Sequence, residues 1–521
     1  MFLWRYNKTI LRLFTLTLVM AIWVGTVNYT PYAQENQPSE PWTPETSQSP
    51  LGSLALTHHV FIPQLTQDYP WVSPFGIEST RPLLETNSLL QRAVDLQPGW
   101  TRMGYQVSWA ELQPLPGQTP NWNLLATFET ELRNLKAAGV RPVVIVKDSP
   151  LWALDPIRAQ DANGNLTACG AIAEEHFDEF AGFLSQLVAR YSGPEFNVHD
   201  WELGNEPDVD PTQVLPDSQY GCWGDIEDTL YYGGYHYGRM LASVAPAIKQ
   251  ADSRAVIWMG GLLLDRPESP PSSSDGFPER FFRGVLEAGA APFIDVVPYH
   301  WYTTYWDFIG AGTAYDYDLI LSPYWIKWGG GTIGKARYLR QVMAEYGINK
   351  PLALNESGFG CKESEIYCNT PDDNFYESQA NHLVRYYVRG LSENVSNFFW
   401  YTLNGPGWRF TGLLDEFNQP RKSYLAYQYL SQKLQYARYL YPISYNPDID
   451  AYAFRANSLH VHILWAREDK TVDFSVPASK FIEATDREGV VLYNQSNPPP
   501  QSGSSYLLQV GFEPVFLTLY P

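Results

Sequence analysis

The chain has 521 residues, of which 45% are hydrophobic and 18% are charged, so it can bury a substantial core and is not disordered overall. Its formal net charge is −20 and no basic cluster with interleaved aromatic residues occurs, which argues against nucleic acid and anionic membrane surfaces as partners. Aromatic residues reach 15%, a share that suits core packing as well as stacking on ring-shaped ligands.

The amino terminus has the order of an export signal. Three basic residues within the first twelve precede an uncharged, apolar stretch at 13–27. We therefore expect residues 1–33 to direct the chain out of the cytoplasm. Cleavage and retention as a membrane anchor are both open, because Pro31 stands two places before Ala33 where a small residue is typical, and a stretch of this length can also span a bilayer.

Residues 34–70 are expected to form a linker with one short strand. The part at 34–50 is rich in Pro, Ser, Glu and Gln, which cannot offset the entropy of the chain by burial. A short apolar run follows at 54–65. Folded structure is therefore expected to begin near residue 71.

From 71 to 433, strand-like and helix-like runs alternate, which predicts a parallel sheet. The expected strands lie at 75–78, 100–104, 141–147, 200–204, 255–260, 294–299, 352–355 and 397–402. Helical patterns, with apolar positions three or four residues apart, lie at 124–138, 174–191, 235–251, 279–289, 334–346 and 374–392. Eight such strand–helix units close into a (β/α)8 barrel.

Beyond the barrel, at 434–521, the pattern changes to short strands separated by turns. Examples lie at 451–456, 458–465, 471–476 and 514–520. This stretch predicts a small β-sandwich domain that follows the barrel.

Four cysteines, an even number, fit a chain that leaves the reducing cytosol. Their spacing suggests that Cys361 pairs with Cys368 and that Cys169 pairs with Cys222. Zinc binding is the alternative, but the sequence has no C-x-x-C pair and no neighbouring cluster of His residues.

Two glutamates stand at the ends of the fourth and seventh predicted strands, where barrels of this kind carry their reactive groups. Glu206 lies in Trp-Glu-Leu-Gly-Asn-Glu-Pro, and Glu356 lies in Leu-Asn-Glu-Ser-Gly-Phe. They are expected to face each other across the barrel mouth. Two carboxyl groups about 5 Å apart are what retaining cleavage of a glycosidic bond requires.

These motifs resemble the clan of (β/α)8 retaining glycoside hydrolases, in particular its cellulase-like and β-xylosidase-like families, over roughly residues 76–433. The resemblance implies that Glu206 is the general acid/base and that Glu356 is the nucleophile. It also implies that Asn205 holds the 2-hydroxyl of the sugar. A charged Glu356 would favour protonation of Glu206, whereas Arg102 and a tyrosine hydroxyl would keep Glu356 ionised.

Further strand ends match the clan. His300 and Tyr302 resemble its His-x-Tyr, whose members flank the nucleophile, and Arg102 resembles the strand-two Arg that supports the nucleophile. Trp400 resembles the strand-eight Trp that forms the floor of the sugar subsite. Each has a simpler interpretation: Arg102 as an ion-pair residue of the core, His300 as a hydrogen-bonded core residue, and Trp400 as packing.

Two aromatic stretches allow both a binding and a packing interpretation. Trp109 and the residues up to Trp122 resemble the loop after strand two in the β-xylosidase-like and β-galactosidase-like families. The segment 301–328 contains many Trp and Tyr residues that could stack on sugars or pack against the barrel rim. The residues on either side of Glu356 depart from the pattern of many relatives, which leaves the subfamily open.

The sequence thus predicts a retaining O-glycosyl hydrolase that cleaves β-linked oligo- or polysaccharides by double displacement, with no metal ion or organic cofactor. One alternative is a non-catalytic carbohydrate-binding or adhesion protein on the same barrel. Another is a metal-dependent hydrolase, although the nine His residues are scattered and no H-E-x-x-H motif occurs. The sugar, the choice between endo and exo cleavage, and the oligomeric state are left unassigned.

Overall fold

The computed structural model describes residues 73–80, 87–102, 104, 106–215, 220–268, 276–305, 315–320, 323–361, 366–444 and 446–521. All of them belong to one unit, Pro63–Pro521. The expected export signal or membrane anchor at 1–33 and the linker at 34–70 lie outside the described residues. Among the helices that are described, none is both long enough and apolar enough to cross a membrane.

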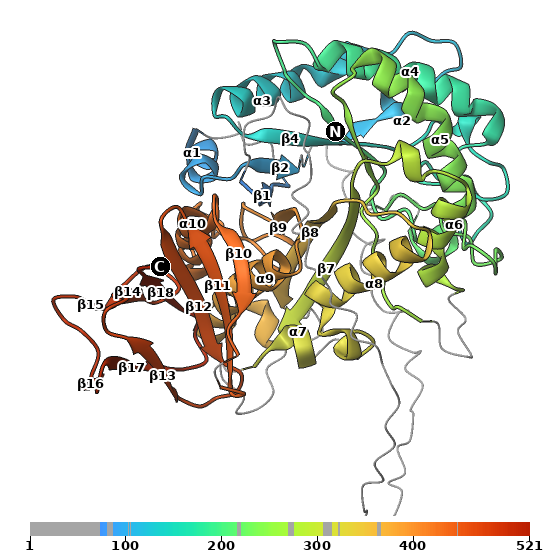
Figure 1. The fold of residues 1–521 in the computed structure, drawn as a ribbon. Coiled ribbons are helices and arrows are strands. Elements are labelled where there is room, and N and C mark those ends of the chain that lie inside the picture. The colour runs from blue at the N-terminus through green and yellow to red at the C-terminus, as the bar shows by residue number, and fades with distance from the viewer. Residues whose placement is uncertain are drawn as a thin grey trace, which may run out of the picture. The chain divides into compact units, whose positions relative to one another are not determined.

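Within the described residues, eight parallel strands curl into the predicted barrel (Figure 1), in the order β6-β5-β4-β2-β1-β9-β8-β7. Their bounds are β1 (Phe75–Glu78), β2 (Trp100–Arg102), β4 (Arg141–Lys147), β5 (Asp200–Leu203), β6 (Val256–Met259), β7 (Val297–Tyr305), β8 (Leu352–Cys361) and β9 (Asn397–Tyr401). The short strand β3 (Val107–Ser108) also pairs with β4. Parallel bridges between Trp258 and Val296 and between Leu262 and Tyr299 join β6 to β7 and close the ring.

Helices follow the strands and cover the outside of the barrel (Figure 1). They are α1 (Asn87–Asp95), α2 (Trp109–Leu112), α3 (Ala126–Ala137), α4 (Phe177–Tyr191), α5 (Gly234–Ala251), α6 (Phe281–Glu287), α7 (Tyr317–Ile320), α8 (Gly331–Glu345), α9 (Asp373–Ser392) and α10 (Lys422–Leu434). Their apolar residues recur every three or four positions, as with the buried Phe180, Leu184 and Leu187 of α4. Helix α9 begins where the Asp372 carboxylate accepts the Phe375 N–H.

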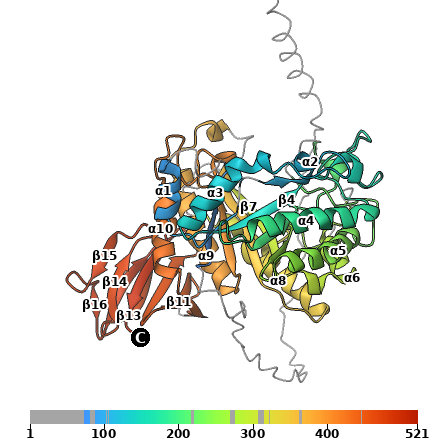
Figure 2. The same cartoon turned by 90° about the horizontal axis from the view of Figure 1, so that it is seen from above.

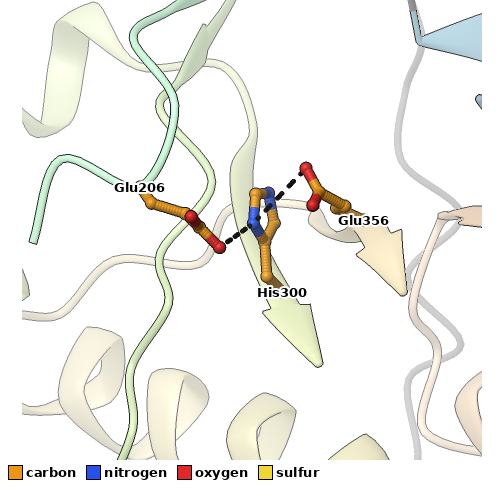
Figure 3. A group of neighbouring side chains, drawn as sticks. All are labelled: Glu206, His300 and Glu356. Atoms are coloured by element: carbon orange, nitrogen blue, oxygen red, sulfur yellow. Dashed lines mark hydrogen bonds and ion pairs between the residues drawn. The ribbon is translucent and has the colours of Figure 1, made fainter. Parts of the chain in front are cut away.

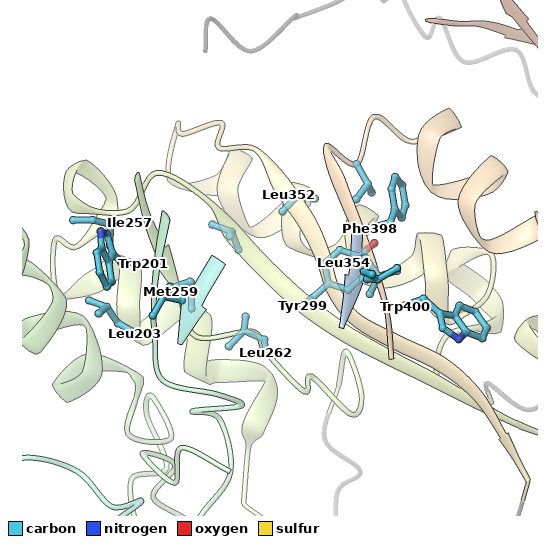
Figure 4. Close-up of a cluster of buried hydrophobic side chains, with 14 of the residues drawn as sticks. Trp201, Leu203, Ile257, Met259, Leu262, Tyr299, Leu352, Leu354, Phe398 and Trp400 are labelled. Atoms are coloured by element: carbon cyan, nitrogen blue, oxygen red, sulfur yellow. The ribbon is translucent and has the colours of Figure 1, made fainter. Parts of the chain in front are cut away.

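Side chains along each barrel strand alternate between the barrel interior and the layer beneath the helices. In β9, Phe399 packs inside the barrel, while Phe398 and Trp400 belong to the outer layer. Figure 4 shows members of this outer layer: Trp201, Leu203, Ile257, Met259, Leu262, Tyr299, Leu352, Leu354, Phe398 and Trp400. The same alternation places Tyr401, at the end of β9, on the inner side.

After α10 the chain forms two antiparallel sheets, β10-β11-β12-β18-β14-β15 and β13-β17-β16, which lie beside α9 and α10 (Figure 2). Their strands are β10 (Arg438–Pro442), β11 (Ile449–Ala456), β12 (Leu459–Ala466), β13 (Val472–Pro477), β14 (Phe481–Thr485), β15 (Val491–Asn494), β16 (Gln501–Ser502), β17 (Ser505–Val510) and β18 (Val515–Leu519). Apolar residues from both sheets share one core, which confirms the predicted β-sandwich. Its separation from the barrel as a domain at 434 stays a prediction, because both belong to one unit.

Both predicted disulfides are formed. Cys169 pairs with Cys222, which links the loops after β4 and β5, and Cys361 at the end of β8 pairs with Cys368. Since all four thiols are used in these bonds, the zinc alternative is wrong.

Candidate active site

Six of the seven predicted site residues meet at the carboxyl ends of the barrel strands. Arg102 ends β2, Asn205 and Glu206 follow β5, His300 and Tyr302 lie in β7, and Glu356 lies in β8. Arg102 and His300 are fully buried, and Glu206 retains 6% of its exposure.

His300 lies between the two glutamates (Figure 3). Its Nδ1 is 2.8 Å from Glu206 Oε1 and 3.7 Å from Glu356 Oε2. One oxygen of each glutamate and a nitrogen of the imidazole all lie within 4.8 Å of one another. Behind the ring, a Cβ on Gly261 would lie 2.2 Å from His300 Nε2, so a side chain there would displace the imidazole.

The backbone at Glu206 is held in a conformation that L-residues rarely adopt. Its φ of 48° lies in the left-handed region, and its N–H donates to the Gly261 carbonyl at 3.0 Å. Gly204, two residues earlier, has a φ of 96°. A non-Gly residue persists in this region only when its surroundings fix it, and such residues gather at functional sites.

An irregular pairing in β8 turns two consecutive residues towards the barrel interior. Tyr299 of β7 pairs with Leu354, but His300 pairs with Glu356, so Asn355 is an extra residue in β8. Asn355 Nδ2 donates to Glu202 Oε1 at 2.9 Å, while Glu356 meets Arg102 and Tyr302. The departure from the clan pattern noted in the sequence thus coincides with a bulge.

Arg102 is the central cation of the site and donates to four side chains. Its Nε and Nη2 reach the two carboxylate oxygens of Glu202 at 2.8 Å and 3.0 Å. Its Nη1 reaches Glu356 Oε2 at 2.5 Å and Glu78 Oε2 at 3.1 Å, and Nη2 also donates to Asn205 Oδ1 at 2.6 Å. Paired charges of this kind hold one another in a fixed geometry.

Glu78 and Glu202 were missed as site residues in the sequence. Glu202 lies four residues before Glu206 in a buried strand, and a charged residue at such a position needs a partner inside the barrel. Glu78 ends the otherwise apolar strand Phe-Gly-Ile-Glu and pairs in register with Arg102. Charged residues within short buried strands were the available signal.

The two glutamates have opposite electrostatic surroundings. Burial raises the pKa of Glu206 well above its usual range, and the negative charge of Glu356 raises it further. Burial alone would also raise the pKa of Glu356, but His300, Arg102 and the Tyr302 hydroxyl outweigh it and lower that pKa. Because burial lowers the pKa of His300 to about 4, the ring is neutral near pH 7. Arg102 and Tyr302, whose hydroxyl donates to Glu356 Oε1 at 2.6 Å, therefore keep Glu356 ionised there.

Glu206, His300 and Glu356 are side chains of types that can bind a metal ion. In this protein the Arg102 guanidinium already lies 2.5 Å from Glu356 Oε2. Its positive charge disfavours a second cation at the same oxygen.

Trp400 lies away from this site, so the prediction that it forms the floor of a subsite is wrong. The ring is fully buried in the outer layer (Figure 4), at 6.1 Å from Tyr386 and 6.4 Å from His382 of α9. Its Nε1 donates to the Thr411 carbonyl at 2.9 Å. The packing interpretation of Trp400 is the correct one.

Two later aromatic residues reach the mouth instead. Tyr401 pairs in register with Glu78, and its ring lies 6.0 Å from that of Tyr302. Trp408, in the short helix η9 (Trp408–Phe410), is 43% exposed and lies 5.1 Å from the Tyr302 ring. The Arg409 guanidinium stacks on Trp408 at 4.3 Å from the ring centre.

In the other predicted aromatic stretches, Trp109, Trp122 and Trp325 pack within the protein, whereas Tyr324 is 52% exposed. Trp109 is fully buried against Phe180 and Phe183 of α4, and Trp122 stacks on Phe183. In the segment 301–328, Trp325 packs against Tyr338 of α8. Residues 306–314 and 321–322 of that segment lie outside the described residues.

No protein-family model and no curated protein matches the chain. Three similar solved structures share its fold. A family 39 glycoside hydrolase from the gut symbiont Bacteroides cellulosilyticus WH2 is 18% identical with a TM-score of 0.60, over 86% of this chain and 80% of its own. A GH30 endoxylanase from Clostridium papyrosolvens C71 is 12% identical with a TM-score of 0.54, over 87% and 97%.

The third, a conserved exported protein from Bacteroides fragilis, is 11% identical with a TM-score of 0.58, over 86% of this chain and 98% of its own. At such identities the likeness concerns the fold. The resemblance inferred from the sequence is thereby confirmed at that level: the chain has the barrel fold of glycoside hydrolases of families 39 and 30.

Proposed function

We propose that the protein is a retaining O-glycosyl hydrolase that cleaves β-linked glycosides or polysaccharides through a glycosyl-enzyme intermediate. The observation that carries the proposal is the distance of at most 4.8 Å between a carboxyl oxygen of Glu206 and one of Glu356. Retaining enzymes place their two carboxyl groups about 5 to 5.5 Å apart, whereas inverting enzymes separate them by about 6.5 to 9.5 Å. The fold shared with glycoside hydrolases supports the same reaction.

In the first step, an ionised Glu356 attacks the anomeric carbon while a protonated Glu206 gives its proton to the departing oxygen. The lowered pKa of Glu356 and the raised pKa of Glu206 fit these two roles. Asn205, fixed by its bond to Arg102, is positioned to hold the 2-hydroxyl of the sugar. The products are the free leaving group and an ester between the sugar and Glu356.

In the second step, water replaces Glu356 at the anomeric carbon. The ester has removed the negative charge of Glu356, which was one cause of the raised pKa of Glu206. Glu206 is then a carboxylate that accepts a proton from the attacking water. The C–O bond to Glu356 breaks, and the sugar leaves with its original anomeric configuration.

We also propose an extracytoplasmic location, with residues 1–33 either cleaved or retained as an anchor. Two disulfides fit an oxidising compartment. The similar structure from Bacteroides fragilis is described as an exported protein.

The proposal is tested by hydrolysis of aryl β-glycosides and β-linked polysaccharides, with NMR of the anomeric proton in the first product. Glu356→Gln should lose nearly all activity, because no carboxylate remains to attack. Glu206→Gln should lose about 10²- to 10⁴-fold on polysaccharides and less on aryl glycosides, whose leaving groups need little protonation. The exposed Glu195→Gln serves as the control.

Undiminished turnover in Glu356→Gln would contradict the nucleophile assignment, and an inverted first product would contradict the retaining mechanism. A wild-type protein that binds these polysaccharides without cleaving them would favour the alternative of a carbohydrate-binding protein.

A further inference from the structure

The outward-facing residues at the end of β7 attach this strand to α7. His300 and Tyr302 face the site, whereas Trp301 and Thr303 alternate to the other side of the strand. Trp301 Nε1 donates to Asp318 Oδ1 at 2.7 Å, and Thr303 Oγ1 donates to the Tyr317 carbonyl at 3.1 Å. The position of α7 thus bears directly on the strand that carries two site residues.

Asp318 is a buried junction between this strand and α8. It is 1% exposed, and its Oδ1 also accepts the N–H groups of Gly331 and Thr332 at 3.1 Å each. The indole of Trp301 packs so closely on Gly331 that a Cβ there would lie 2.0 Å from the ring. The space beside Gly331 therefore accommodates the Trp301 ring, and the hydrogen bond to Asp318 fixes the ring there.

Arg389 of α9 connects this junction to the C-terminal sheets. Its Nη1 and Nη2 bind the two oxygens of Asp316 at 3.1 Å and 2.5 Å, and its Nη1 lies 3.9 Å from Asp318 Oδ2. Its Nη2 also donates to Asp450 Oδ2 at 3.2 Å, and Asp450 lies in β11. Arg467, which follows β12, donates to the other oxygen of Asp450 at 2.8 Å.

The charged side chains of Arg389, Asp316 and Asp450 are desolvated, so they interact strongly. Arg389 is 4% exposed, and Asp316 and Asp450 are largely buried. Burial would raise the pKa of Asp316, but Arg389 outweighs it and lowers that pKa to about 2. The neighbouring Arg385 adds positive charge, whereas burial lowers the pKa of His382 to about 3 and leaves it neutral near pH 7.

We propose that the C-terminal sheets set the position of His300 and Tyr302, through Asp450, Arg389, Asp316, Asp318 and Trp301. Arg389 and Asp450 are positioning residues for the reaction, so the C-terminal sheets contribute to the geometry of the active site. The inference rests on the proposed hydrolase function. It predicts that a change in β11 alters the ionisation of Glu356, which Tyr302 supports from β7.

The test compares Asp450→Ala with a matched control on the same sheets. Glu483→Ala removes another ion pair between the sheets and the barrel, in which Lys433 of α10 lies 2.9 Å from Glu483. In the described part of the chain, the hydrogen bonds and ion pair of these two residues do not reach β7. In Asp450→Ala, kcat should fall about 5-fold, which is a small part of the roughly 10²-fold that a full 1 Å misplacement can cost. The acid limb of kcat/KM should move to higher pH, because Tyr302 no longer stabilises the Glu356 carboxylate fully. Glu483→Ala should match the wild type in both.

Trp301→Phe keeps an aromatic ring at this position but removes the indole N–H that donates to Asp318, so it should move the acid limb in the same direction. The double variant with Asp450→Ala should show no larger shift than Trp301→Phe alone, because both changes break one line of contacts. An unmoved acid limb in Asp450→Ala, whatever its stability, would overturn the inference, as would additive shifts in the double variant.

Amide hydrogen exchange at 299–305 separates this inference from the proposed function. If the wild type hydrolyses nothing, the proposed function fails, but faster exchange in Asp450→Ala and not in Glu483→Ala still supports the positioning role. Equal exchange in both variants would overturn that role.

Discussion

Glu206 and Glu356 are the same residue type in one site, yet different neighbours decide the charge of each. Glu206 meets a neutral imidazole, whereas Glu356 meets a guanidinium at 2.5 Å and a phenol hydroxyl at 2.6 Å. Both are desolvated, so burial does not distinguish them. The comparison teaches that the cation and the hydroxyl beside Glu356 keep it ionised near pH 7, whereas burial and the negative charge of Glu356 keep the proton on Glu206.

Removing the cation should have the largest effect on this difference. Arg102→Met leaves Glu78, Glu202 and Glu356 without their common partner, and breaking a buried ion pair typically costs about 3–5 kcal/mol of stability. The pKa of Glu356 should rise towards that of Glu206, so the acid limb of kcat/KM moves to higher pH and kcat collapses. Urea unfolding and pH–rate profiles measure the two effects.

Arg102→Lys serves as the comparison variant, because it keeps the charge and loses the fork of N–H donors. It should lie between Arg102→Met and the wild type in both measurements. A wild-type acid limb in Arg102→Met would show that the cation does not set the ionisation of Glu356.

Removing the hydroxyl should have a smaller effect in the same direction. Tyr302→Phe loses one hydrogen bond to a charged acceptor, worth about 1.5–3 kcal/mol, which corresponds to roughly 1–2 pH units in the acid limb. Tyr427→Phe, which loses a bond to the Gly76 carbonyl on another part of the barrel wall, controls for the loss of a buried hydroxyl. An acid limb that moves equally in both variants would assign the shift to general loosening.

The smallest effect concerns stability and the proton on Glu206. Its raised pKa means that the folded protein binds this proton more tightly than the unfolded chain, so its contribution to stability is lost as pH rises from the unfolded value through the folded one. Glu206→Gln does not titrate. Relative to this variant, the wild type should lose up to about 1.4 kcal/mol per pH unit in that window.

Thermal unfolding of the wild type and Glu206→Gln at several pH values measures this difference, with Glu195→Gln as the control. A constant difference between the wild type and Glu206→Gln across pH would mean that Glu206 ionises normally in the folded protein.

Much of the fold was readable from the sequence, because strand-to-helix alternation and the residues at strand ends are local signals. The error at Trp400 shows where local signals stop. Successive side chains of a strand point to opposite faces. Taking Trp400 instead of Tyr401 as the inward-facing residue therefore assigned to the barrel interior a side chain that lies in the layer under α9. Only the pairing of Ile77 with Trp400 and of Glu78 with Tyr401 fixes that choice.

The sequence predicted most of the site residues, but not the contacts that hold them in place. The glutamates were visible because each follows an Asn at a strand end. The bulge that turns Asn355 and Glu356 to the same side depends on pairing with β7, which no local pattern reports. The link from Trp301 to Asp450 joins residues far apart in the chain, so it too appears only once the sheets are in place.

The disulfide between Cys169 and Cys222 has a consequence for how the protein is produced. Gly221, next to Cys222, packs so closely on Asn205 that a Cβ would lie 2.6 Å from its carbonyl oxygen. In a reducing expression host the barrel strands would still pair, but the tether that presses this loop onto the residue before Glu206 would be missing. The choice of host is therefore part of the design of any activity assay, and soluble material from a reducing cytoplasm is not equivalent to the oxidised protein.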